Sequence, residues 1–142
     1  MPVQAAQQEA GWQARLHLAF RRASQRTLLA ERRREGPLAV QRAFYPEDDL
    51  CHVYLLHPPG GVAGGDQLNI NVETGRNAAA LLTTPGATKF YHSVGPHARL
   101  QQNLTVTAGS LEWLPQENIL FPGADIELAT RVELKDGATF IG

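Results

Sequence analysis

The stretch that decides the fold is residues 12–20, WQARLHLAF. Large or small apolar side chains take every second position in it, and polar residues alternate with them: Gln13, Arg15, His17 and then Arg21. A period of two places one face of the segment in a core and the other in water. The stretch therefore predicts an antiparallel β-strand that is buried on one side.

The same alternation recurs along the chain. It marks residues 67–72, 100–106 and 126–134, and more apolar runs predict strands at 38–44, 51–56 and 78–83. The alanine-rich run at 78–82 is compatible with a helix. A strand is at least as well supported, because the run is short and ends at residues 83–86, TTPG. Only residues 88–93 predict a brief helical turn.

Proline and glycine residues separate these runs at intervals of about ten residues, which is typical of all-β folds. We expect a two-layer, sandwich-like fold of antiparallel or mixed sheets, with few short helical turns. No sequence repeat is visible. We expect a flexible segment at 1–11 and one β domain from 12 to 142. Residues 139–142, TFIG, have the pattern of a new strand that has just begun, so the chain is expected to be truncated.

Charge is unevenly distributed along the chain. Residues 1–42 contain eight arginines and three acids, and the remainder contains five bases and eleven acids. The cluster at 31–35, ERRRE, favours a solvated face or a protein-partner surface over nucleic acid, because glutamates flank it and no nucleic-acid motif accompanies it. The sequence has no signal-peptide pattern and no run of about 20 apolar residues, and its lone cysteine fits a reducing compartment. We expect a cytoplasmic protein without a nucleic-acid or membrane partner.

The densest turn is residues 57–66, HPPGGVAGGD. It lacks the Gly-Lys-Ser/Thr ending of a nucleotide-binding loop and precedes a strand, not the helix of a dinucleotide fold. One interpretation is a structurally demanding turn; the other is a rigid loop that holds Asp66 in a defined place. The predicted structural loop consists of Pro58, Pro59, Gly60, Gly61, Gly64 and Gly65.

Metal-binding and catalytic patterns are weak. The soft or borderline ligands Cys51, His52, His57, His92 and His97 have no spacing that suits a permanent zinc site. No nucleophile elbow occurs, and Cys51 lies in an apolar run that suits a packing role. Glu112 and Glu117 interrupt an apolar segment, either at the rim of the core or buried with a partner or metal. They fit an acid–base pair poorly, whereas transient nickel contacts from scattered histidines and carboxylates stay open. The residues thus indicate a protein that is not an enzyme.

Three stretches in this order resemble one family: residues 56–66 (LHPPGGVAGGD), 83–91 (TTPGATKFY) and 111–117 (LEWLPQE). Residues 36–41 (GPLAVQ) and 44–47 (FYPE) precede them. Together they resemble the amino-terminal half of the urease accessory protein UreD, called UreH in some bacteria. The resemblance runs from about Trp12 to the end.

The resemblance implies a β-rich fold and a chaperone role in nickel insertion into urease, the assembly of its metallocentre. The implied partners are UreF, the GTPase UreG through UreF, and urease apoprotein, within one protein complex. No cofactor is expected to stay bound, and nickel is expected only in transit, along a polar passage. Our hypothesis is that Asp66, Glu112 and Glu117 line it, with His57 a weaker candidate and Lys89 a structural or interface residue.

One alternative from the residues alone is a β-sandwich ligand- or carbohydrate-binding module, or an enzyme fragment, with its site at the Gly60–Asp66 loop. Trp12 and Trp113 would then be the stacking platforms, although both lie in core-like patterns. Another is an interaction fragment whose edge strand pairs with a second chain.

Overall fold

The computed structural model describes residues 11–57 and 60–142. Those residues form thirteen strands and no helix, which confirms the all-β prediction. The strands are β1 Gln13–Arg22, β2 Thr27–Glu35, β3 Ala39–Val40, β4 Cys51–Leu56, β5 Gly61–Val62, β6 Gln67–Thr74, β7 Ala79–Thr83, β8 Thr88–Phe90, β9 Ala98–Thr107, β10 Ser110–Trp113, β11 Asn118–Leu120, β12 Ile126–Lys135 and β13 Thr139–Ile141.

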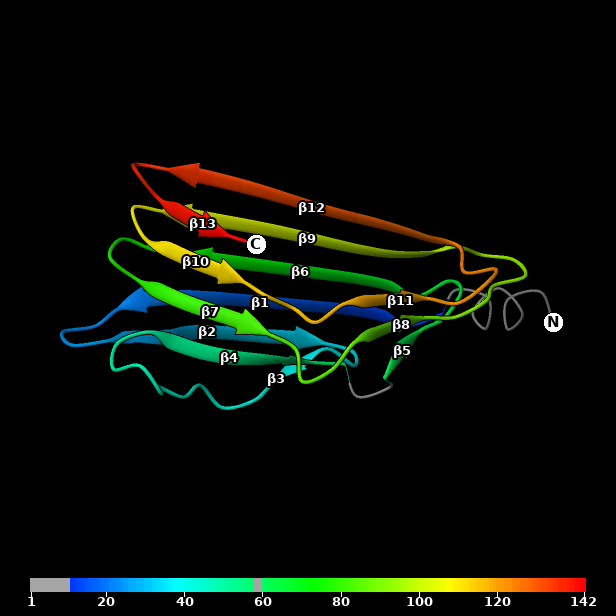
Figure 1. Cartoon of the computed structure of the whole chain (residues 1–142), viewed down its shortest axis with the longest axis horizontal. Coiled ribbons are helices and arrows are strands. Elements are labelled where there is room, and N and C mark those ends of the chain that lie inside the picture. Colours follow the sequence, from blue (N-terminus) through cyan, green and yellow to red (C-terminus); the bar gives the residue numbers. More distant parts are fainter. Residues whose placement is uncertain (1–10, 58–59) are drawn as a thin grey trace.

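The strands stack into three sheets that the chain visits in turn (Figure 1). One sheet has the order β12-β9-β6-β1-β2, the second β13-β10-β7-β4-β3, and the third β11-β8-β5. Strands β4, β5 and β6 make one coil, β7 to β9 the next, β10 to β12 a third, and β13 begins a fourth. Equivalent strands begin about 30 residues apart, a spacing typical of solenoid folds, so the molecule is a β-solenoid.

Strand direction is where the structure refines the prediction. Mixed sheets were expected and are found, but most neighbours run parallel; β1 is antiparallel to β2 and parallel to β6. Alternation reports that one face is buried, and it says nothing about the direction of the neighbouring strand. The coils form a structural repeat that the sequence does not show, because their inner faces need apolar residues and not identical ones.

The core lies inside the coils. Parallel register stacks like residues in columns, so that Leu68 lies beside Leu100 and Val72 beside Leu104. All four side chains are buried, and burying a leucine or valine contributes about 1.5–3 kcal/mol. This column packing holds successive coils together and leaves the outer faces in water.

Two local predictions were wrong in detail. Residues 88–93 were expected to form a helical turn, but Thr88–Phe90 is strand β8, which pairs with β5 and β11 on its two sides. The ladder supplies the hydrogen bonds that a lone turn would otherwise need. The strand expected over 38–44 is short, because only Ala39–Val40 is regular and Phe44 makes an isolated bridge to His52.

The basic cluster at residues 31–35 lies in β2, a strand that the sequence did not predict because arginines conceal the alternation. Trp12, expected in the core, is 54% exposed. The strand over 126–134 is confirmed as β12, but its apolar face is only partly covered, since β12 is the last strand of its sheet. Residues 139–141 form a strand as expected, paired with β10.

Residues 1–10, most of the segment expected to be flexible, lie outside the described residues, as do Pro58 and Pro59. Gly11 is described and packs against Gly65 and Asp66. Among residues 11–57 and 60–142, no helix has the length and apolar character that crossing a membrane requires.

Candidate functional site

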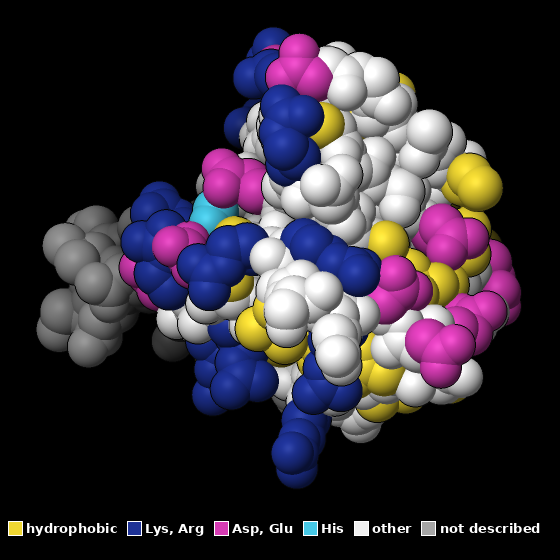
Figure 2. All heavy atoms as spheres, turned by 90° about the vertical axis from the view of Figure 1, so that its left-hand side faces the viewer, with side chains coloured by type: hydrophobic (Ala, Val, Ile, Leu, Met, Phe, Trp, Pro, Cys, Tyr) yellow, Lys and Arg dark blue, Asp and Glu magenta, His cyan; other side chains and the backbone are white. Residues whose placement is uncertain are grey.

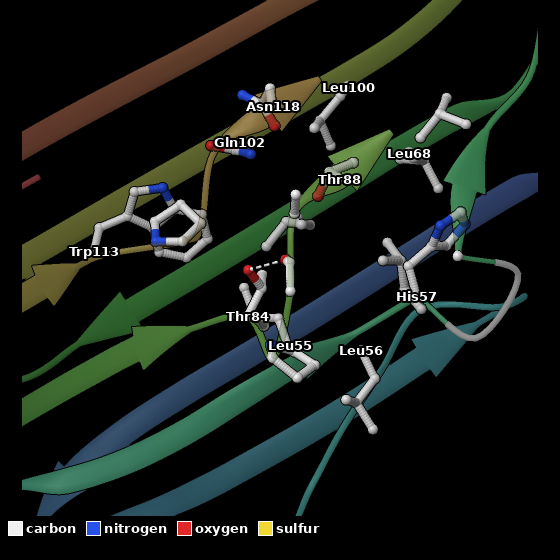
Figure 3. A pocket seen from close by; sticks show the side chains of 18 of the residues that line it. Leu55, Leu56, His57, Leu68, Thr84, Thr88, Leu100, Gln102, Trp113 and Asn118 are labelled. Carbon is white, nitrogen blue, oxygen red and sulfur yellow. Dashed lines mark hydrogen bonds between the residues drawn. The ribbon is translucent and has the colours of Figure 1, made fainter. Parts of the chain in front are cut away.

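The coils line a partly open cavity of about 440 Å³ near the end of β4 (Figure 3). Its walls are inner-face side chains of the stacked strands, and polar groups come both from the strands and from the corners between them. The apolar walls include Leu55, Leu68, Leu100 and Trp113, and the polar groups include His57, Thr84, Gln102 and Asn118. An apolar pocket with a few converging polar groups is the usual form of a binding site.

His57 follows directly after β4 and lies at one end of this cavity. Its Nε2 is buried and has no hydrogen-bond partner among the described residues. Burial lowers the pKa of His57 below its ordinary value of 6.5, because the surroundings disfavour the charged ring; the carboxylate of Asp66 acts in the opposite direction. A neutral imidazole with a free nitrogen is a good metal ligand and a good hydrogen-bond partner.

Asp66 lies in the turn between β5 and β6 and is 2% exposed. Its Oδ1 accepts a hydrogen bond of 2.8 Å from the backbone amide of Trp12, and its Oδ2 accepts one of 2.8 Å from the amide of Ala63. The carboxylate thus ties the start of β1 to the first coil. Of the two interpretations of the glycine-rich turn, the second describes Asp66 well: the loop holds it in a defined place.

The two glutamates lie elsewhere. Glu112 is on β10 between the buried Leu111 and Trp113, so its half-exposed side chain is on the outer face of the sheet. Glu117 is exposed at the corner before β11. Neither glutamate nor Asp66 lines the cavity, and no group of three or more His, Cys, Asp or Glu residues within 11–57 and 60–142 is arranged to hold a metal ion.

The glycine-rich turn is closely packed on its neighbours. A side chain at Gly61 would meet the ring of Tyr91, and one at Gly64 would meet Ser93 and the carbonyl of Pro96. Gly60 and Gly65 have φ angles of 82° and 86°, which favour glycine. The turn is therefore a contact surface for the second coil, and Lys89 is exposed on β8 next to it.

Cys51 is fully buried, and burial raises the pKa of its thiol. A thiol of this kind is poorly reactive, as expected for a packing residue.

Sequence reasoning missed the cavity, which needs corner residues from three coils. The run TTPG at 83–86 was the available signal, since Thr84, Pro85 and Gly86 all line the space.

This geometry defines a class of protein: a β-solenoid with broad sheet surfaces, the form that repeat folds use for binding other molecules. The family model described as UreD urease accessory protein matches residues 13–142. The chain belongs to this family.

Several curated relatives carry the name urease accessory protein UreD. The chain is 55% identical to one from Alcanivorax borkumensis, over 93% of this chain and 47% of that protein. It is 57% identical to one from Aliivibrio fischeri over 93% and 46%, and 50% identical to one from Pseudomonas putida over 98% and 50%. The chain therefore spans about half the length of the curated relatives it matches.

Proposed function

We propose that this chain acts as a non-catalytic accessory protein in the maturation of urease, where it supports insertion of nickel into the active site. The observation that supports the proposal is the family match over residues 13–142, together with relatives named urease accessory protein UreD. In this role the protein is a cytoplasmic chaperone and scaffold between urease apoprotein and the UreF–UreG complex. Nickel is its cargo and not a resident cofactor.

The test is complementation in the source organism. The gene is deleted and then supplied again on a plasmid, and the nickel content and activity of purified urease are measured. We expect the deletion to yield urease protein with little nickel and the supplied gene to restore it. Full nickel loading in the deletion strain would contradict the proposal.

Nickel transit is the finer part of the proposal. We propose that Asp66, Glu112 and Glu117 contact the cation one after another, because the three are spread over a buried turn, an outer sheet face and an exposed corner. Carboxylates that act singly bind a divalent ion weakly enough to release it. His57 offers a neutral nitrogen ligand beside the cavity.

The variants for this test keep side-chain size and remove charge: Asp66→Asn, Glu112→Gln and Glu117→Gln. Glu73→Gln is the matched control, because Glu73 is an exposed strand acid outside the three motifs. We expect the triple variant to lower urease nickel while the accessory complex still assembles, and the control to load nickel normally. Normal loading by the triple variant would remove these acids from the route.

A further inference from the structure

A groove of about 950 Å³ lies at the first end of the solenoid, between β2 and the segment that follows β3. Its floor is apolar and includes Leu29, Phe44 and Tyr45. Three arginines rim it: Arg26 and Arg32 on the β2 side, and Arg42 on the other. This combination of apolar floor and basic rim is separate from the interior cavity, which lies farther along the coils.

The three arginines have no carboxylate partner among the described residues. Two acids of the segment before β4 are engaged elsewhere: Asp49 with Arg22 at 2.9 Å, and Glu47 with His52 at 2.7 Å. Arg26 lies over the ring of Tyr45 at 4.1 Å, a cation–π contact that holds it at the rim without neutralising it. Figure 2 shows one face of the molecule, on which basic side chains gather mainly on one side and carboxylates occur on both.

The backbone of β2 adds a second property. β2 is the last strand of its sheet, and one edge of it pairs with β1. On the other edge, the described backbone contact outside the ladder is the amide of Thr27 donating to the carbonyl of Asp49. The carbonyl of Thr27 on this edge also accepts a hydrogen bond of 2.6 Å from the Oη of Tyr45, and the backbone of Leu29 bonds to Cys51. Beyond Leu29, no described residue other than those of β1 is hydrogen-bonded to the backbone of β2, so this part of the edge is a template for an added strand. The arginines discourage neutral or basic strands from pairing there and favour an acidic one.

We propose that this groove binds an extended, acidic segment of a partner protein, which adds to the edge of β2. In such a segment alternate side chains point to the same side. Its apolar residues would rest on Leu29 and Phe44, and its carboxylates would pair with Arg32 and Arg42. Arginine suits this role because its planar guanidinium binds a carboxylate through two hydrogen bonds.

The test uses the full chain and a fluorescein-labelled ten-residue peptide of alternating glutamate and valine, followed by anisotropy. Its companions are the lysine–valine peptide and a single-stranded RNA of similar length. We expect the acidic peptide to bind, the lysine peptide not to bind, and affinity to fall with added salt. The pair Arg32→Ala and Arg42→Ala should weaken binding at least tenfold, whereas Arg32→Lys with Arg42→Lys should retain part of it.

The matched control is Arg76→Ala, an exposed arginine in the turn between β6 and β7 that pairs with Asp136. It should bind the peptide like the unaltered chain, and circular dichroism should show all variants folded. Equal loss of affinity in the control would overturn the groove assignment. Failure of the acidic peptide to bind, or RNA binding that the same two substitutions abolish, would overturn the proposal of a protein segment.

Discussion

The carboxylate of Asp66 accepts a hydrogen bond of 2.8 Å from the backbone amide of Trp12, which lies 54 residues earlier in the chain. Its second oxygen accepts the amide of Ala63. One buried side chain thus satisfies two backbone donors and fastens the first strand to the first coil. Hydrogen bonds to a charged group contribute about 1.5–3 kcal/mol each, and a donor left unpaired in the interior adds a penalty.

The first prediction follows from this arrangement. Asp66→Ala should lower the free energy of unfolding by roughly 3–6 kcal/mol, because two backbone amides lose their charged acceptor. Urea denaturation followed by circular dichroism measures it. Asp125→Ala is the matched control, since Asp125 is exposed directly before β12, as Asp66 is buried directly before β6. Equal losses in the two variants would show that the hydrogen bonds of Asp66 do not stabilise the fold.

The second prediction concerns two buried threonines. The Oγ1 of Thr27 accepts a hydrogen bond of 2.7 Å from the amide of Ala79, whereas the Oγ1 of Thr74 has no partner among the described residues. Thr27→Val should therefore cost about 1–3 kcal/mol, and Thr74→Val should be neutral or stabilising. The substitution is the same in both, so volume and shape cancel. Thermal unfolding measures the change in stability of each variant. A similar change in both variants would contradict the prediction.

The third prediction concerns the glycine-rich turn. Gly64→Ala would place a methyl group against the hydroxyl of Ser93 and the carbonyl of Pro96, which themselves share a hydrogen bond of 2.6 Å. Overpacking of this kind costs about 1–3 kcal/mol. Gly86→Ala is the control, because nothing lies within 4 Å of a side chain there. It should leave stability unchanged or raise it slightly by restricting the unfolded chain. Chemical denaturation that ranks the two variants in the opposite order would refute the packing argument.

Much of the fold was predictable because alternation reports burial directly. The strands at 51–56 and 67–72 follow from their side chains alone. The coiled path was not predictable, since it depends on which way each corner turns and not on strand composition. β2 was missed for a different reason. The residues of β2 that pair with Leu16 and Leu18 of β1 are Arg34 and Arg32, so the sequence of β2 lacks the alternation of apolar and polar residues that marks the other strands.

For the candidate site, too, local features were predictable from the sequence and contacts between distant segments were not. The glycine-rich loop drew attention to Asp66, but nothing local reveals that its partner is the amide of Trp12. The cavity depends on groups from separate coils, such as His57, Gln102 and Asn118. Their proximity is a property of the stacking, and it becomes visible only when the register of the parallel strands is known.

The last prediction uses the titration of His57. Burial lowers its pKa below 6.5, the value expected in the unfolded chain, so the unfolded state binds the proton more readily. The contribution of a neutral His57 to stability is complete above pH 6.5 and is lost as the pH falls through the lowered pKa of the folded state. His57→Gln removes this titration but keeps a polar side chain of similar size at the cavity.

The measurement is the free energy of unfolding of both proteins from about pH 7.5 to pH 5. The two proteins differ only at position 57, so the difference between the two curves isolates His57. We expect the unaltered chain to lose more stability on acidification than the variant does. His97→Gln, at an exposed position, should follow the unaltered chain. A constant difference across the range would mean that His57 is not held in its neutral form. A difference that grows in favour of the unaltered chain in acid would mean that the carboxylate of Asp66, and not burial, dominates the environment of the ring.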